Sequence, residues 1–310
     1  MKIGVLLWPQ TQSWAPFRDA AVRVDRAGLD SLWTWDHLNA IVGPWEQPIL
    51  EGWSTLAALG PITSHATLGL MVGANTFRNP GLTAKLATTL DHVSGGRAIL
   101  GIGGAWFERE HDAFGFETWG SGFGERLDRL DESVMLLRRL LDGERIANHE
   151  GRFYRIHDAL CEPRPVQPHL PILIGGSGPQ KTLRTTARYA DAWNSGGTVE
   201  ELRKKDATLR ERCAEVGRNP DEIERTCSVW LAIRDDAKAA RRVLEEAAAA
   251  NGDPLAEDDD DVYVGTVEEV ADRLRPIVEL GFRHVIVDMP GPYDPETIDR
   301  LPELRDALSR

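Results

Sequence analysis

Two ionisable residues stand together directly after a short apolar run. The run Ser31–Thr34 is typical of a buried strand, and Trp35, Asp36 and His37 follow it. Histidine changes its charge near neutral pH, and a carboxylate beside it orients or tunes it where the loop brings the two together. Asp36 and His37 are therefore our candidate catalytic residues for acid–base chemistry. The alternative interpretation is a surface histidine beside a helix-capping aspartate.

Glycines and an amide side chain follow the next two apolar runs. Thr67–Gly73 leads into Asn75, whose amide offers a donor and acceptors to a heterocyclic ring. Asn75 has an alternative role as a cap near the helix that opens at Pro80. The run Ala98–Ile102 ends in a glycine cluster that includes Gly103. This cluster permits close approach of a ligand, although crowding between strands explains it equally well.

A glycine-rich turn follows the fifth apolar run. Gly176, Ser177 and Gly178 precede a predicted helix at Gln180–Tyr189, which contains Lys181. Backbone N–H groups in such a turn, with a helix N-terminus behind them, bind anions. The turn therefore predicts a phosphate-binding site, with Lys181 near enough to assist.

These residues need a framework of strands and helices to bring them together. Short apolar runs, each followed by loop residues, predict strands at Ile3–Trp8, Ser31–Thr34, Thr67–Gly73, Ala98–Ile102, Pro171–Gly175, Ala192–Ser195, Thr226–Ile233 and His284–Asp288. Amphipathic segments predict helices at Ala15–Gly28, Gly52–Ser64, Pro80–Val93, Glu125–Leu141, Gln180–Tyr189, Val199–Val216 and Val267–Leu280. The alternation predicts an α/β fold, a closed (β/α)8 TIM barrel with insertions, in one domain over residues 1–310. An open parallel sheet is the alternative.

Three long segments interrupt the alternation at Asn39–Glu51, Trp106–Gly124 and Asn251–Asp261. In a barrel, long segments after strands lie on the catalytic face and act as lids. The acidic run at 257–261 is interpreted as a solvated loop. A charged cluster, Glu108 to Asp112 with His111, resembles a set of metal ligands, but a charged helix or lid surface explains it more simply.

Composition excludes several classes of function. The chain has 310 residues, a net charge of −13 and 42% hydrophobic residues, so it is globular and lacks the basic surface that nucleic acid or an anionic membrane would need. Its three cysteines have no metal-binding spacing, and no metal motif occurs elsewhere. The N-terminus enters a strand directly and no segment has the length of a membrane span. We expect a cytoplasmic enzyme without a metal.

Several long motifs in fixed order resemble the luciferase-like monooxygenase superfamily, and within it the branch of oxidoreductases that use the deazaflavin coenzyme F420. The resemblance covers nearly the whole chain and rests on GLDSLWTWDHL (28–38), LGLMVGANTFRNP (68–80), LDHVSGGRAILGIGG (90–104), PVQPHLPILIGGSG (165–178) and ARYADAWN (187–194). It implies an insertion-bearing (β/α)8 barrel with the cofactor ring at the C-terminal mouth, and commonly a homodimer, for which the apolar residues of 52–64 and 80–93 are available.

The resemblance also implies roles for particular residues. Asp36 and His37 match the acid–base pair beside the reactive ring carbon. The remaining matches concern the cofactor: a bulge with a non-prolyl cis peptide at Met71 and Val72, a ring contact at Asn75, the glycine at Gly103, the phosphate-binding turn at Gly176, Ser177 and Gly178, and the end of the sixth strand at Trp193 and Asn194.

The chain differs from the family's sugar-phosphate dehydrogenases at one position. Those enzymes carry a glutamate just after the fourth-strand glycines, where this chain reads Gly104-Ala105-Trp106, with Glu108 two residues later. We therefore expect a flatter or more apolar small-molecule substrate than a sugar phosphate.

The expected activity is hydride transfer between coenzyme F420 and a small organic substrate, with His37 exchanging a proton and Asp36 stabilising its charged form. Three alternatives stay open. Reduced FMN with oxygen would make the protein a monooxygenase, a flavin-binding protein without catalysis is a second possibility, and a metal-dependent barrel hydrolase is a third.

Overall fold

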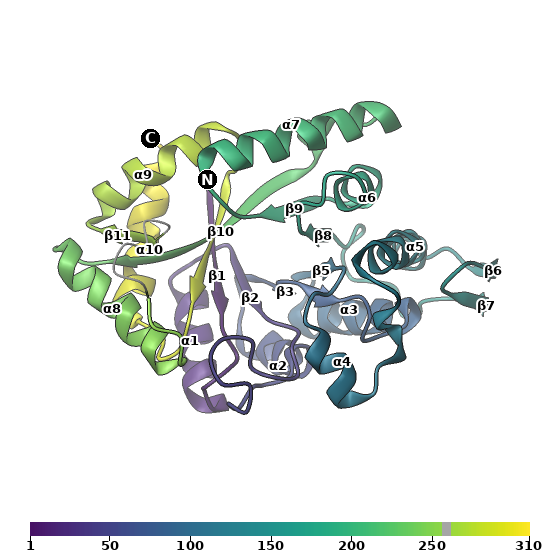
Figure 1. The fold of residues 1–310 in the computed structure, drawn as a ribbon, viewed down its shortest axis with the longest axis horizontal. Coiled ribbons are helices and arrows are strands. Elements are labelled where there is room, and N and C mark those ends of the chain that lie inside the picture. The colour runs from purple at the N-terminus through teal and green to yellow at the C-terminus, as the bar shows by residue number, and fades with distance from the viewer. Residues whose placement is uncertain (256–261) are drawn as a thin grey trace.

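Eight parallel strands close into a barrel in the computed structural model, which describes residues 1–255 and 262–310. In barrel order the strands are β1 (Lys2–Leu7), β2 (Ser31–Thr34), β3 (Thr67–Leu70), β5 (Ala98–Gly103), β8 (Ile172–Gly175), β9 (Ala192–Ser195), β10 (Glu224–Ile233) and β12 (His284–Met289). The first and last strands complete the circle, with Lys2 opposite His284 and Leu7 opposite Met289. The predicted (β/α)8 barrel is therefore confirmed, and the alternative of an open parallel sheet is wrong (Figure 1).

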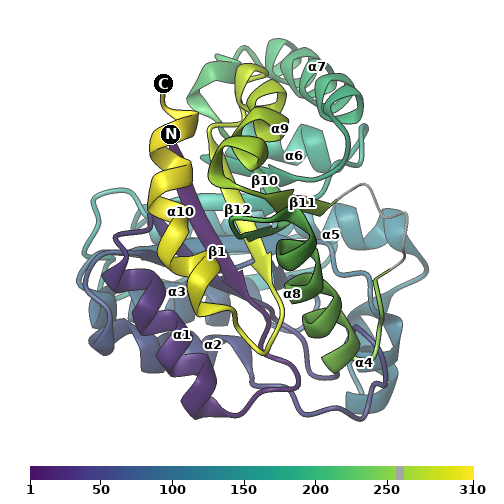
Figure 2. The ribbon, with the colours of Figure 1, turned by 90° about the vertical axis from the view of Figure 1, so that its left-hand side faces the viewer.

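Helices surround the barrel on its outer face, as Figures 1 and 2 show. They are α1 (Trp14–Arg26), α2 (Gly52–Leu59), α3 (Pro80–Ser94), α4 (Glu108–Phe114), α5 (Phe123–Leu141), α6 (Thr182–Tyr189), α7 (Val199–Val216), α8 (Ala237–Ala250), α9 (Val267–Glu279) and α10 (Pro295–Leu308). A capping box opens α9, where the Thr266 side chain accepts from Glu269 N and the Glu269 carboxylate accepts from Thr266 N. Among the described helices, none is long and apolar enough to cross a membrane.

Side chains on the two faces of the strands form two separate clusters. Outward-facing residues such as Val5, Leu68 and Val287 pack under the helices in the main hydrophobic core. Inward-facing residues such as Leu6 and Ile286 fill the barrel interior with several indole rings. This alternation follows from the strand period of two residues, and it sends every second residue at a strand end into the barrel mouth.

The strand predicted at Thr67–Gly73 is interrupted. β3 ends at Leu70, and pairing resumes only in the short β4 (Gly73–Ala74), which lies beside β5. Between them the Met71–Val72 peptide bond is cis, as the family resemblance implied. The break displaces two residues from the sheet at the barrel mouth.

Several elements lie where none was predicted. They are the antiparallel hairpin of β6 (Ile146–Glu150) and β7 (Arg155–Ala159), the helices α8 and α10, and β11 (Val262–Gly265), which extends the sheet beside β10. The helix α4 falls on the charged cluster that was interpreted as a charged helix or lid surface. Of the third interrupting segment, 251–255 are described. The acidic run at 257–261 lies outside the described residues.

Candidate functional site

The bulge between β3 and β4 fits against three glycines of the neighbouring strands. A Cβ built on Gly103 would lie 2.8 Å from Val72 Cγ2, and one on Gly175 would lie 2.8 Å from the same atom. A Cβ on Gly101 would lie 1.9 Å from the carbonyl oxygen of Leu70. The glycine cluster that ends β5 is therefore required by the close approach of the bulge, which supplies the physical reason that the sequence left open.

His37 lies at the mouth beyond β2, and its imidazole is held by a carboxylate from the α4 segment. His37 Nδ1 lies 2.9 Å from Glu110 Oε2. The other carboxylate oxygen of Glu110 accepts from the backbone N–H groups of Leu38 and Asn39. Because Glu110 is buried and acceptor-only when ionised, Nδ1 is the donor. No described residue hydrogen-bonds to Nε2, which is left for a ligand.

Asp36 does not contact the imidazole of His37, contrary to the expected pairing. Its carboxylate accepts from Arg78 Nη1 at 2.6 Å and Nη2 at 2.9 Å, and from the backbone N–H of Ala74 at 2.8 Å. Arg78 also reaches Glu51 at 3.0 Å. Neighbouring residues at a strand end point in opposite directions, so Asp36 fastens the bulged segment while His37 faces the mouth.

The buried ion pair has a clear electrostatic consequence. Burial alone would lower the pKa of Arg78, but the carboxylates of Asp36 and Glu51 raise it above its usual value. Burial alone would raise the pKa of Glu51, and hydrogen bonds from the first turn of α2 together with Arg78 lower it instead. Arg78 and Glu51 therefore carry their charges at neutral pH, and together with Asp36 they hold the β2 end, the bulge and α2 together.

The charged cluster around Glu110 forms a helix, which is one of the two simpler interpretations, but it is not an exposed surface because two of its members are buried. Glu110 binds His37, and His111 donates from Nδ1 to the Phe107 carbonyl at 3.1 Å and accepts at Nε2 from Thr76 Oγ1 at 2.6 Å. Burial lowers the pKa of His111, so the imidazole is neutral at pH 7. α4 is thus docked on the mouth by its polar side chains.

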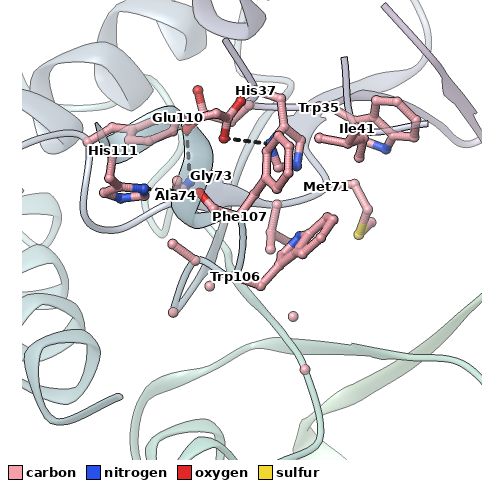
Figure 3. Close-up of a pocket in the computed structure, with 18 of the residues that line it drawn as sticks. Trp35, His37, Ile41, Met71, Gly73, Ala74, Trp106, Phe107, Glu110 and His111 are labelled. Carbon is pink, nitrogen blue, oxygen red and sulfur yellow. Dashed lines mark hydrogen bonds and ion pairs between the residues drawn. The ribbon is translucent and has the colours of Figure 1, made fainter. Parts of the chain in front are cut away.

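These elements enclose a cavity of about 310 Å³ at the carboxyl ends of the strands (Figure 3). Its described lining consists of Trp35, Asp36, His37, Ile41, Met71, Val72, Gly73, Ala74, Phe77, Gly103, Gly104, Ala105, Trp106, Phe107, Glu110, His111, Phe123, Gly175, Gly176 and Asn194. The lining is mainly apolar and aromatic, and no lysine or arginine is part of it. In Figure 3, Trp106 and Phe107 lie beside the imidazole of His37. A mainly apolar cleft of this size with a few convergent polar groups is typical of a site for a small ring-bearing ligand.

Five of the nine predicted cofactor residues line this cavity, whereas Ser177 and Gly178 lie outside its lining and two others lie behind its wall. Asn75 is buried and donates to the Tyr154 hydroxyl at 3.3 Å. Trp193 is fully buried in the outer core, and its Nε1 donates to the Gly176 carbonyl at 2.7 Å. Both residues therefore shape the wall from behind. Asn194 does line the cavity and donates to Thr226 Oγ1 at 2.9 Å.

The glycine-rich turn leaves backbone donors unused. Gly176 has a φ of 111°, which favours glycine, and its N–H donates to the Asn194 carbonyl at 3.1 Å. The N–H groups of Ser177 and Gly178 have no partner among the described residues, which suits an anion. Lys181 does not assist, because its ammonium binds Asp128 at 2.7 Å.

No group of three or more described His, Cys, Asp or Glu residues has the arrangement of a metal site. The functional residue that the sequence did not identify is Glu110. Its one sequence signal is the position of a carboxylate on a long segment after the fourth strand, because such segments fold back over a barrel mouth.

Comparison with known proteins places this geometry in a family context. The model of the luciferase-like monooxygenase family matches residues 1–284. An F420-dependent glucose-6-phosphate dehydrogenase of Intrasporangium calvum is 31% identical, covering 93% of this chain and 94% of that protein. An F420-dependent secondary alcohol dehydrogenase, solved with an F420–acetone adduct, superposes with a TM-score of 0.86 at 20% identity, covering 99% and 98%. Monooxygenase RslO1 from Streptomyces bottropensis superposes with a TM-score of 0.82 at 24% identity, covering 100% and 99%.

Proposed function

Because the chain belongs to the luciferase-like monooxygenase family, we propose that it is an oxidoreductase that transfers a hydride between coenzyme F420 and a small organic substrate. The observation that carries this proposal is the imidazole of His37, which faces a ring-sized aromatic cavity with Nδ1 fixed by Glu110 and Nε2 free. An acid–base group in this position serves a reaction in which a proton and a hydride leave or reach one substrate.

The residues present fit a tricyclic cofactor with an anionic tail. Met71 and Val72 present the bulge to the cavity, and Gly103 gives the bulge its room. Asn194 offers a polar contact at the wall. Ser177 and Gly178 supply the unused N–H groups for a phosphate, with Gly176 shaping the turn. When bound, F420 supplies the redox chemistry by accepting or donating the hydride.

The protein contributes orientation and a path for the proton. Glu110 holds His37 Nδ1–H, so Nε2 accepts a proton from a substrate or returns it. The buried Glu110 carboxylate stabilises the imidazolium that forms. Trp106 and Phe107 beside the imidazole exclude water from the reacting centre. Asp36 acts indirectly, by keeping the bulged segment in place through Arg78 and Ala74.

The lining disfavours a sugar phosphate as the substrate. Recognition of a phosphate dianion needs cationic side chains, and the described cavity lining contains none. Ala105 stands where a glutamate was expected from sugar-phosphate dehydrogenases, beside the indole of Trp106. The relative named as a glucose-6-phosphate dehydrogenase therefore shares the cofactor rather than the substrate, and we expect no turnover of glucose 6-phosphate.

Titration of the cofactor-free protein with F420 and with FMN tests the proposal. We expect F420 to bind at least tenfold more tightly and to be reduced in a screen of small alcohols and other uncharged donors, seen as loss of the oxidised cofactor's absorbance. Tighter FMN binding with oxygen consumption would establish the monooxygenase instead. Tight cofactor binding without turnover of any compound would establish a flavin-binding protein.

We also propose the organisation of the protein in the cell. One domain over residues 1–310 is supported by the pairing of the first strand with the last. A homodimer through α2 and α3 is supported by the exposed side chains of Ile62, Leu82 and Val93 on that face. A cytoplasmic location suits three free, buried cysteines and the acidic composition.

A further inference from the structure

Two polar side-chain atoms lack partners on the part of the barrel mouth formed by β1, β10 and β12. Trp8 directly follows β1, and Asp288 is the last residue but one of β12. Trp8 Nε1 and Asp288 Oδ1 are buried, and no described residue hydrogen-bonds to either atom. A buried donor and a buried acceptor that stay unpaired both cost free energy, so their presence together indicates a binding site.

The strand register directs Asp288 toward the barrel interior. Ile286 packs with Leu6 and Trp33 in the interior cluster, and the residue two positions further along a strand points to the same face. Asp288 is paired with Leu6 on β1 and with Trp230 on β10. Figure 2 shows β1 and β12 side by side beneath α10.

Trp8 packs directly against the lining of the cavity that contains His37. Trp35 lines that cavity, and its ring centroid lies 4.6 Å from that of Trp8. Trp8 in turn contacts Trp230, with centroids 5.1 Å apart. At the other edge, the cavity residue Asn194 donates to Ser228 Oγ at 3.3 Å, and Ser228 lies on the same face of β10 as Trp230. A ligand in the cavity can therefore extend to Trp8 and Asp288.

The carboxylate of Asp288 determines which ligand groups can bind beside Trp8. Asp288 is partly exposed, burial of the carboxyl raises its pKa to about 7, and none of the described basic side chains forms an ion pair with it. The ionised carboxylate repels anions and accepts hydrogen bonds, whereas Trp8 Nε1–H only donates. A hydroxyl group is complementary to both atoms, since it can donate to the carboxylate and accept from the indole.

We propose that Trp8, Asp288 and Trp230 form a subsite that binds a hydroxyl group of the substrate and rejects carboxylate and phosphate groups there. This inference rests on the proposed function, because the subsite defines which substrates reach His37. The contacting indole rings of Trp8 and Trp230 offer an apolar surface to the hydrocarbon that carries the hydroxyl, and the reacting carbon lies nearer to His37.

Indole NMR spectra of the F420-loaded protein test this subsite directly. The chain has ten tryptophans, and the Nε1–H signal of Trp8 is the one that Trp8→Phe removes. At pH 8.5, where Asp288 is charged, cyclohexanol should shift that signal, and cyclohexanecarboxylate should bind at least tenfold more weakly. Asp288→Leu should weaken cyclohexanol binding about tenfold, the effect of one hydrogen bond to a charged group.

Two further variants keep the test decisive. Asp288→Asn preserves the shape of the side chain, and it should raise the affinity for cyclohexanecarboxylate at least threefold by removing the repelling charge. Asp272→Leu removes the same charge from an exposed position on α9 and should change neither affinity. An unmoved Trp8 signal, equal affinities for the two probes in the unaltered protein, or no gain of carboxylate binding in Asp288→Asn would overturn the proposal.

Failure of the subsite can be told apart from failure of the proposed function. F420 binding is measured separately by cofactor titration of the same samples. Selective cyclohexanol binding in a protein that does not bind F420 would leave the subsite intact and reject the proposed function. Normal F420 binding with no discrimination between the probes would reject only the subsite.

Discussion

At the scale of single residues, the mouth divides its charged groups between structure and chemistry. Asp36 accepts hydrogen bonds from Arg78 and from the Ala74 backbone, so its carboxylate is committed to the bulged segment. One carboxylate oxygen of Glu110 accepts from the backbone N–H groups of Leu38 and Asn39, and the other accepts from His37 Nδ1. The chemistry therefore depends on His37 with Glu110, whereas Asp36 maintains the geometry around them.

Replacement of His37 and Glu110 should reveal that they act as one unit. We expect His37→Ala to lower kcat about 10²–10⁴-fold, the usual contribution of a general acid–base group, with nearly unchanged F420 affinity. Glu110→Gln should lower kcat roughly tenfold, because a neutral amide stabilises an imidazolium less well than a carboxylate does. Stopped-flow reduction of F420 measures both effects.

The double variant separates this role from a merely structural one. If Glu110 works through His37, then Glu110→Gln should cost little further rate in the His37→Ala background. Asp36→Asn serves as the comparison, and its loss of rate should persist in that background. Multiplicative losses for His37 and Glu110 would show that Glu110 acts independently.

A second residue-scale prediction concerns acid stability at the opposite end of the barrel. Burial alone would raise the pKa of Glu224, but hydrogen bonds and charge from His284 and Lys2 lower it to about 2. The unfolded chain therefore binds this proton first as the pH falls. The stabilisation is complete above pH 4.5 and is lost progressively as the pH falls toward 2.

Urea unfolding at several pH values checks this effect. We expect the unaltered protein to lose stability between pH 4.5 and 2.5 more steeply than Glu224→Gln, which cannot take up the proton. Asp158→Asn is a suitable control, since its carboxylate pairs with Arg145 at the exposed β6–β7 hairpin and screening by solvent makes that pair weak. Parallel curves for Glu224→Gln and the unaltered protein would refute the assignment.

At the scale of elements, the sequence predicted the regular strands but not the break between β3 and β4. Short apolar runs followed by loop residues predicted all eight barrel strands. The break itself came from family resemblance, because no local pattern separates Leu70 from Gly73. The charged residues of α4 indicated an exposed helix or lid surface, whereas Glu110 and His111 are buried by contacts with His37 and Thr76, which are distant in sequence.

The same break predicts the effect of adding a methyl group to a neighbouring strand. In Gly175→Ala the new Cβ would lie 2.8 and 2.9 Å from the two γ-carbons of Val72. The bulge must then shift, at a cost of about 1–3 kcal/mol in unfolding free energy, and F420 affinity should fall. Val72→Ala in the same chain should recover most of both losses, which thermal unfolding and cofactor titration measure.

A methyl group placed elsewhere near the mouth provides the control. In Gly124→Ala the new Cβ would come no nearer than 3.6 Å to Lys181 Nζ, so stability and affinity should stay unchanged. If the loss in Gly175→Ala persists in full without the Val72 side chain, then contact with the bulge is not its cause.

At the scale of the whole molecule, closure of the barrel leaves α2 and α3 beside one another on the surface. This face carries three exposed apolar side chains, with Ile62 44%, Leu82 53% and Val93 42% exposed. Exposed apolar residues that gather on one face mark an interface more often than scattered ones. The sequence indicated these helices as a contact, but it could not show which of their residues the core leaves uncovered.

Charges placed on this face should therefore dissociate the proposed homodimer. Full burial of a leucine or isoleucine contributes about 1.5–3 kcal/mol, so Ile62→Lys/Leu82→Lys should weaken association roughly 10³-fold or more for two such residues. We expect sedimentation velocity to show twice the 34.4 kDa chain mass for the unaltered protein and the single chain mass for the double variant. Val216→Lys changes a similarly exposed residue, 43% exposed on α7, and should leave the dimer intact. Because α5 and α6 separate α7 from α3 around the barrel, dissociation by Val216→Lys, or a dimer that survives the double variant, would place the interface elsewhere.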